Sequence, residues 1–474
     1  MPHPCESLTR LWSETDVEAQ HQNLRAWLVV LMLCCSFANA SSASAQTMED
    51  INPRIQPAMK VDLKLVQANG LRIINGRHIT IYTDVPASET IEELSTIFDA
   101  AVPQWCDYFG VNVDEAKLWK MQAFLIRDKV RFEKAKLVPA NLPKFPAGIN
   151  QGHEIWFFLQ PDDYYTRHLL LHEGTHAFML WFGNGLGAPW YAEGMAELLG
   201  LHQWKDGKLT IHHRVKDSSE SDGWGRPKLI KDWVAANKDG RKDKSLQDIL
   251  LTPNRAFGEV ENYAWCWAAC EFLGQHPLSK DRFPDLQKHV NRSPQSFNRK
   301  FERLFAEDLS VLERDWAWFI RELDYGYSVS RGSMIELRMS DVDGQYSLKT
   351  DHSWQYLNMV VKAGQKFRVS AAGRFEIGSS QVNGQTKPWP CEPNGITIDY
   401  YRGRPIGELQ AFVLPSDNSA GLLGEICASN PVTIGVNNVI TSDVDGLLCF
   451  RINESPANLN DNRGELKLAI EKIE

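Results

Sequence analysis

The segment His172-Glu173-Gly174-Thr175-His176 lies within an apolar stretch, Leu169 to Phe182, that is typical of a buried helix. Residues four apart on an α-helix share one face. The two imidazoles therefore point off the same side of the helix and are spaced to bind one zinc ion, with Glu173 beside them to act on a water molecule. A helix with two core-facing histidines is the alternative that this pentapeptide leaves open.

The residues that follow add metal-binding chemistry. Gly183-Asn184-Gly185 predicts the end of the helix, and a second helix opens after Pro189. Glu193 follows His176 by seventeen residues, which is enough for a turn and an antiparallel return, so Glu193 is predicted to be the third zinc ligand. Glu197 lies one helical turn further and is predicted to accept a hydrogen bond from the outer nitrogen of a zinc-bound histidine.

This compound motif resembles that of the gluzincin metallopeptidases, in particular the bacterial peptidase-MA-like proteins. Thermolysin-like and membrane-alanyl-aminopeptidase-like enzymes are more distant relatives. The resemblance implies a zinc metallopeptidase with a zinc-activated water. It also implies these roles: zinc ligands His172, His176 and Glu193, general base Glu173, and supporting carboxylate Glu197.

The resemblance has departures. Trp190 follows Pro189 directly, which differs from the spacing in those proteins. The aminopeptidases bind the substrate amine with a Gly-x-Met-Glu-Asn segment on an edge strand, and residues 148–156 lack it. An endopeptidase is therefore predicted, with Glu154 as a weak substitute for the missing carboxylate. The edge strand itself can pair with an extended peptide.

Two further residues near the motif carry expectations. Tyr263 begins a downstream helix where related families place an oxyanion-stabilising tyrosine, so it is a candidate catalytic residue. A tyrosine that packs at a helix start is the alternative. His168 lies one turn before His172 and is predicted to be structural, because a fourth nitrogen ligand would close the metal site.

The pattern of apolar residues predicts two folded domains. Residues 46–328 mix strands and helices, which predicts an α+β domain with a mixed sheet and a mainly helical lobe. Past a linker near 325–334, short apolar runs between turns predict an all-β jelly-roll or sandwich domain at 335–474. The expected strands and helices of the first domain are strands 77–83, 121–126 and 155–159 and helices 88–109, 162–183, 190–202, 260–274 and a long run near 280–323.

The chain's last hairpin, Cys449 to Leu466, and the strand end at 369–373 are similar to those of the bacterial galactophilic jelly-roll lectins. The resemblance implies calcium and a carbohydrate or cell-surface ligand. Glu454 stands where that family has Asp, and an Asn-rich turn without metal is the alternative. The implied calcium ligands are side-chain oxygens of Glu454, Asp461 and Asn462 and main-chain carbonyls of Asn458 and Ile377.

Residues 1–45 resemble a secretory signal peptide. Arg25 precedes an apolar run from Ala26 to Ala38, and small-residue cleavage sites end at Ala40 and Ala45. This predicts a periplasmic or extracellular protein with no stable membrane span, an uncleaved anchor being the alternative. Six cysteines follow this segment and allow disulfides, while Cys266 and Cys270 are expected to be buried small hydrophobes.

The 474-residue chain carries a net charge of −9, which gives no basic footprint for nucleic acid. The sequence therefore predicts a secreted zinc peptidase that acts on a peptide or protein, such as a surface protein or glycoprotein. A non-catalytic surface or glycan-binding protein with a structural or vestigial metal site is the alternative. A third reading keeps the site but assigns it a glycan or non-peptide amide substrate.

Overall fold

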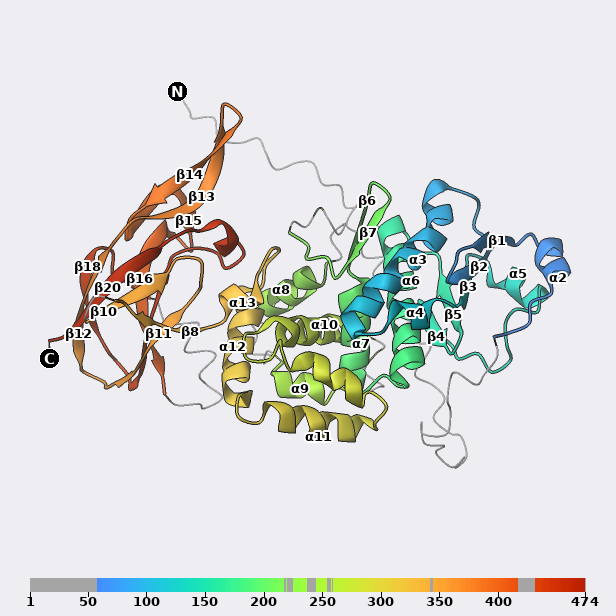
Figure 1. The fold of residues 1–474 in the computed structure, drawn as a ribbon, viewed down its shortest axis with the longest axis horizontal. Coiled ribbons are helices and arrows are strands. Elements are labelled where there is room, and N and C mark those ends of the chain that lie inside the picture. Colours follow the sequence, from blue (N-terminus) through green and yellow to red (C-terminus); the bar gives the residue numbers. More distant parts are fainter. Residues whose placement is uncertain are drawn as a thin grey trace, which may run out of the picture.

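A computed structural model describes residues 58–216, 219, 225–236, 244–253, 257, 259–341, 344–416 and 431–473. A small mixed sheet lies at one end, helices occupy the middle, and two larger sheets form the other end (Figure 1). The prediction of a mixed α/β chain with a strand-rich C-terminal region is confirmed. The predicted signal peptide lies outside the described residues.

The first sheet has three parallel strands flanked by two antiparallel edges. In sheet order its strands are β1 (Arg72–Asn75), β2 (Ile79–Thr83), β3 (Met121–Ile126), β5 (Glu154–Phe158) and β4 (Gly148–Gln151). Strands with parallel partners are covered on both faces, which explains why β3 reads as a continuous apolar run. The short strand β4 is left at the edge, beside the helix that carries the histidines.

Both faces of this sheet are packed by helices. Leu125 and Phe157 point into the main core, whereas Phe124 and Trp156 point into a smaller one, where their rings stack at 3.9 Å. The covering helices are α3 (Glu89–Phe109) and α6 (Asp163–Phe178) on the main face, and α2 (Leu63–Ala68) and α5 (Lys129–Lys134) on the other. Strand residues thus alternate between two cores, and α6 is fixed against the larger one.

The helical lobe is built around α7 (Pro189–Gly200) and α10 (Val260–Gln275), which pack closely against each other. Gly194 permits this approach, because a Cβ at that position would meet the Cys266 carbonyl and the Cys270 sulfur at 2.5 Å. Around this pair lie α8 (Arg226–Ala236), α9 (Leu246–Leu250), α11 (Pro294–Phe305) and α12 (Leu309–Glu322).

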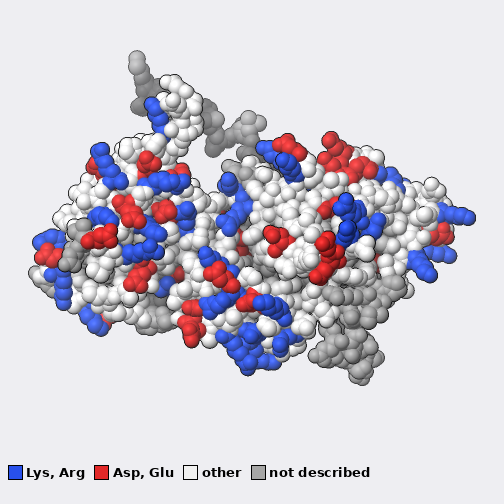
Figure 2. All heavy atoms as spheres, in the orientation of Figure 1, with Lys and Arg blue, Asp and Glu red and all other residues white. Residues whose placement is uncertain are grey.

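The long helical run predicted near 280–323 is wrong as a single element. It is a 3₁₀ segment at Phe283–His289 followed by α11 and α12. Pro294 takes the first position of α11, and a residue before proline avoids the helical conformation, so the chain breaks there. On α11, phenylalanines face inward at every fourth position and leave Arg299 and Arg303 exposed. Figure 2 shows a group of basic side chains in the region of this helix.

The C-terminal region consists mainly of two sheets that share one apolar core. One sheet has the order β18 (Asn437–Thr441), β12 (Lys366–Ala372), β20 (Glu465–Lys472), β10 (Gln345–Lys349) and β9 (Arg338–Met339). The other has the order β15 (Asn394–Tyr401), β16 (Arg404–Pro415), β19 (Gly446–Ile452), β11 (Gln355–Val361) and β8 (Ile335–Glu336). Val369 and Leu468 of the first sheet meet Leu409 and Phe450 of the second in this core.

The helical lobe and the C-terminal sheets are in contact. Trp318 of α12 packs edge-on against Phe412 at a centroid distance of 6.0 Å, within a small apolar cluster of its own. Arg451 of β19 lies 3.2 Å from the Glu322 carboxylate and over the ring of Trp354. The predicted linker contains a short helix, α13 (Val329–Gly332).

The five described cysteines, Cys106, Cys266, Cys270, Cys391 and Cys449, are buried and unpaired, and Cys427 lies outside the described residues. The expectation that Cys266 and Cys270 are buried is confirmed. Among the described helices, none is long and apolar enough to cross a membrane.

Candidate metal centre

The loop between α6 and α7 brings Glu193 back to the two histidines. A single π-helical turn, Met179–Gly183, extends α6, and Asn184 ends it in the left-handed conformation at φ 58°. Asparagine is one of the few residues that adopt this conformation readily. Pro189 then starts α7, which packs on α6. The predicted stop and restart of the helix therefore lie where the sequence placed them.

His172, His176 and Glu193 form a compact group of three donors. Glu193 Oε2 lies 3.3 Å from His172 Nε2 and 3.4 Å from His176 Nε2. Tetrahedral zinc with bonds of about 2.0–2.1 Å holds its ligand atoms about 3.3–3.4 Å apart. Imidazole nitrogens and a carboxylate oxygen are also the donors that zinc takes in proteins. The three residues therefore fit a metal ion of this kind.

The three side chains of this group differ in their exposure to solvent. The histidine side chains are 7% and 10% exposed, whereas that of Glu193 is 21% exposed. Burial alone would raise the pKa of Glu193, but the charge of His176 and hydrogen bonds with both histidines outweigh it and lower the pKa to about 2. Glu193 is thus a carboxylate held in its charged form next to two ring nitrogens, and solvent reaches it.

Glu173 lies between the histidines and the edge strand β4. A Cβ at Gly148 would meet its Oε1 atom at 2.8 Å, so glycine at this point of β4 makes room for the carboxylate. Burial raises the pKa of Glu173, while the charges of His172 and His176 and a backbone hydrogen bond from Asn150 oppose that rise. The structure thus places the predicted general base beside the donor group and beside the strand edge.

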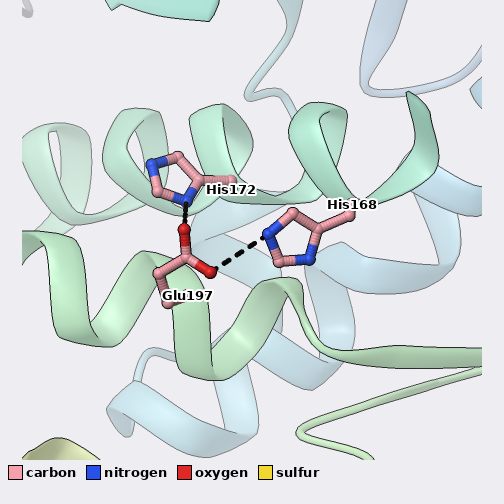
Figure 3. Close-up of side chains that lie close together, drawn as sticks. All are labelled: His168, His172 and Glu197. Carbon is pink, nitrogen blue, oxygen red and sulfur yellow. Dashed lines mark ion pairs between the residues drawn. The ribbon is translucent and has the colours of Figure 1, made fainter. Parts of the chain in front are cut away.

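Glu197 lies on the opposite side of His172, between that ring and His168 (Figure 3). Its Oε1 atom is 3.4 Å from His172 Nδ1, and its Oε2 atom is 3.2 Å from His168 Nε2. Burial alone would lower the pKa of His172, but the hydrogen bonds that its ring donates to Glu193 and Glu197 outweigh it and hold that pKa well above its usual value. Glu197 therefore contacts the outer nitrogen of His172, and His168 contacts Glu197 rather than Glu193.

Arg226 completes this second cluster, and sequence reasoning missed it. Its Nε and Nη2 atoms donate to the two oxygens of Glu197, each at 2.6 Å, and both side chains are buried. Burial would raise the pKa of Glu197, but the Arg226 charge outweighs it and lowers the pKa well below its usual range. No local signal marks this pair, because 29 residues separate the partners along the chain.

Tyr263 lies at the centre, whereas Glu154 does not. The ring of Tyr263 is 6.1 Å from that of His172, and its hydroxyl donates to the Phe257 carbonyl at 3.2 Å. Burial, reinforced by three nearby carboxylates, raises the pKa of Tyr263. Glu154 shares the sheet face of Trp156, away from α6, and accepts hydrogen bonds from the Met59 amide and the Trp156 indole. Glu154 is therefore unavailable to bind a substrate amine at the centre.

Four residues of the predicted calcium set lie in the connection between β19 and β20, which belong to different sheets and so do not form the predicted hairpin. Asn462 donates through its side-chain nitrogen to Glu454 at 2.6 Å and to the Thr350 carbonyl at 2.9 Å. Asp461 ends a short 3₁₀ turn that Asn458 precedes, and this turn contacts β13 (Phe375–Val382), which carries Ile377. Burial raises the pKa of Glu454 to about 7. Calcium binding by these residues stays a prediction.

The chain's similarity to known proteins is found among solved structures. No known protein family and no curated protein matches the sequence. The solved structures that resemble part of it include a lectin domain and a lysozyme inhibitor. The N-terminal domain of EclA, a PllA-like lectin, is 16% identical, with 29% of this chain and 98% of that one covered, at a TM-score of 0.20. PliG of Aeromonas hydrophila, a periplasmic inhibitor of g-type lysozyme, is 13% identical, with 30% and 96% covered, at a TM-score of 0.16. Both TM-scores are low, and neither likeness supports a conclusion about ligand or activity.

Proposed function

We propose that this protein is a secreted zinc-dependent endopeptidase. The observation that supports the proposal is the convergence of His172, His176 and Glu193 on one point, with Glu173 beside them. The donor group has the residue types and spacing that zinc requires. A purely structural zinc has no use for a carboxylate in the position of Glu173, so the catalytic role accounts for one more residue than the structural role does.

In this proposal, zinc when bound lowers the pKa of a water molecule and polarises the scissile carbonyl. His172, His176 and Glu193 hold the ion. Glu173 accepts the proton of the attacking water and passes it to the leaving nitrogen, which is general acid–base catalysis by one carboxylate. Tyr263 supplies a hydroxyl donor near the developing oxyanion once that hydroxyl turns away from the Phe257 carbonyl.

The substrate in this proposal is an extended peptide that lies along β4. This strand is at the end of its sheet, and the backbone amide of Asn150 on it already contacts Glu173. Main-chain pairing with an edge strand positions a peptide whatever its sequence. Glu154 is engaged on the other sheet face, so the described residues around the centre include no amine-binding carboxylate in its place, which favours internal cleavage.

We assign the C-terminal sheets the task of holding the enzyme on a surface protein or glycoprotein. These sheets contact the helical lobe, because Arg451 donates to Glu322 and the rings of Trp354 and Phe412 pack on Trp318. A ligand held by the sheets would therefore also be held to the lobe that carries Glu193. This assignment rests on the lectin-like sequence pattern of the segment from Cys449 to Leu466 and on that contact.

Metal analysis and peptide cleavage test the proposal in one experiment. Wild-type protein and the Glu173→Gln variant are analysed for bound zinc and incubated with a mixed peptide library. We expect about one zinc per chain in both proteins, with cleavage lowered by about 10²–10⁴-fold in the variant because the proton acceptor is lost. Zinc in both proteins with no cleavage by either supports the non-catalytic alternative. Absence of zinc from the wild type contradicts the ligand assignment itself.

A further inference from the structure

We propose that Arg226 is a positioning residue of the metal centre, which fixes the Glu197 carboxylate so that Glu197 in turn fixes the His172 ring. The inference rests on the zinc function proposed above. It adds to that function a residue from α8, a helix outside the α6–α7 pair that carries the donors.

The contacts of Glu197 leave its carboxylate a single orientation. Arg226 approaches with two parallel donors, Nε to Oε2 and Nη2 to Oε1, each at 2.6 Å. Each of those oxygens also faces a histidine, Oε1 facing His172 and Oε2 facing His168. A bidentate guanidinium contact sets the plane of a carboxylate as well as its position. The Nδ1 atom of His172 therefore has a fixed acceptor, and its Nε2 atom stays directed at Glu193.

The ion pair between Arg226 and Glu197 is shielded from solvent. The side chains of Arg226 and Glu197 are 4% and 3% exposed, so water cannot replace either partner. Removing one member of a buried ion pair leaves an uncompensated charge. Arg226 is itself held from another side, because Tyr165 shares a hydrogen bond with it and stacks on His168 at 5.5 Å.

The formal charges around His172 also support the pairing of Arg226 with Glu197. Three carboxylates surround His172, those of Glu173, Glu193 and Glu197, and their charges equal those of one divalent ion plus one guanidinium. By geometry alone, His168, His172 and Glu197 form a second group able to hold a metal ion. Arg226 already donates to both Glu197 oxygens, so its guanidinium is the cation on the Nδ1 side of His172. The metal ion is therefore assigned to the Nε2 side, where Glu193 lies.

The test is the substitution Arg226→Lys, which keeps the charge and removes the two-pronged contact. Zinc affinity is measured by competition with a chelator, and coordination is followed by the visible absorption of the cobalt(II)-substituted protein. We expect zinc to bind about 10–100-fold more weakly, the usual cost of losing an outer-shell partner, with a changed cobalt spectrum because the His172 ring is no longer fixed.

Arg451→Lys is the matched control. Arg451 is a buried arginine paired with a buried glutamate, Glu322, in the contact between the helical lobe and the C-terminal sheets. We expect Arg451→Lys to leave both zinc affinity and the cobalt spectrum unchanged. Equal weakening in the two variants, or wild-type affinity and spectrum in Arg226→Lys, overturns the proposal.

If Arg226→Lys does not fold, the double variant Glu197→Met with Arg226→Met replaces it. This variant removes both buried charges together, a change that proteins often tolerate. It also removes the acceptor of His172, so zinc affinity should fall by the same 10–100-fold. Wild-type affinity in the double variant overturns the proposal. Failure of the wild type to bind zinc contradicts the proposed function, whereas tight zinc binding by wild type and variants alike contradicts this inference alone.

Discussion

The two nitrogens of the His172 ring face similar sets of residues, but the two sets differ in burial and in charge. On the Nε2 side lie His176 and Glu193, and on the Nδ1 side lie His168 and Glu197. Each side therefore has a second histidine and a glutamate within reach of the shared ring. The Nδ1 side holds Arg226 and is buried, whereas Glu193 on the other side is partly exposed. An arginine and an exposed edge, rather than the residue types, distinguish the two sites.

The two glutamates differ in the partner that balances their negative charge. Glu197 has a permanent cation at 2.6 Å and so is fixed in the charged form. The partners of Glu193 are histidines, whose ring nitrogens also bind metals. A carboxylate among histidines, such as Glu193, suits a site that exchanges an ion. A carboxylate paired with an arginine, such as Glu197, suits a site that holds a ring in place.

The largest effect is expected for Glu193→Ala. This substitution removes a proposed ligand, so zinc affinity should fall by more than the roughly 10–100-fold that loss of an outer partner costs. Cleavage should be lost together with the metal. Competition with a chelator and metal analysis measure the change, with Glu197→Ala as the comparison. Retention of zinc by Glu193→Ala and its loss from Glu197→Ala would reverse the assignment of the two sides.

The next effect concerns Tyr263, whose ring lies near His172 while its hydroxyl is bonded to a carbonyl. Tyr263→Phe removes the hydroxyl and keeps the ring, so zinc affinity should stay at the wild-type value. We expect kcat to fall by about 10²–10³-fold, which is the cost of one oxyanion donor. Steady-state kinetics on a cleaved peptide measure it. An unchanged kcat would show that the Tyr263 hydroxyl has no catalytic role and serves only the hydrogen bond with the Phe257 carbonyl.

Local sequence patterns were sufficient for much of this centre. The helical period of α6 places His172 and His176 on one face, and the glycine-rich stop followed by Pro189 predicts the return of Glu193. These features depend on short-range geometry, which a sequence displays directly. Strand β3 and helix α10 were likewise predicted within one residue at each end.

Long-range contacts could not be predicted in the same way. Arg226 meets Glu197 because α8 packs on α10, which in turn packs on α7, and no spacing encodes such a chain of contacts. Glu154 was a candidate by sequence for binding a substrate amine, yet strand alternation turns it to the other sheet face, where the Trp156 indole donates a hydrogen bond to it. The break within 280–323 was missed although Pro294 marks it, because the amphipathic period continues on either side.

Glu454 extends the comparison to a buried carboxylate that forms no ion pair with the described residues. Its side chain accepts a hydrogen bond from the Asn462 amide, and burial raises its pKa to about 7, against an ordinary 4.5. Between these two values the folded chain binds a proton that the unfolded chain has lost, so stability falls as pH rises and levels off above about 7. The loss amounts to about 3 kcal/mol.

Urea unfolding at several pH values between about 4.5 and 8, in the presence of a chelator, measures this loss. The control is Glu454→Gln, which cannot ionise and should lack this contribution while keeping that of every other group. Parallel curves for the two proteins would contradict the prediction. Excess calcium provides a second test, because calcium bound to the Glu454 carboxylate would supply the missing positive charge and restore stability near pH 8. A pH dependence that calcium leaves unchanged would show that calcium does not bind the Glu454 carboxylate.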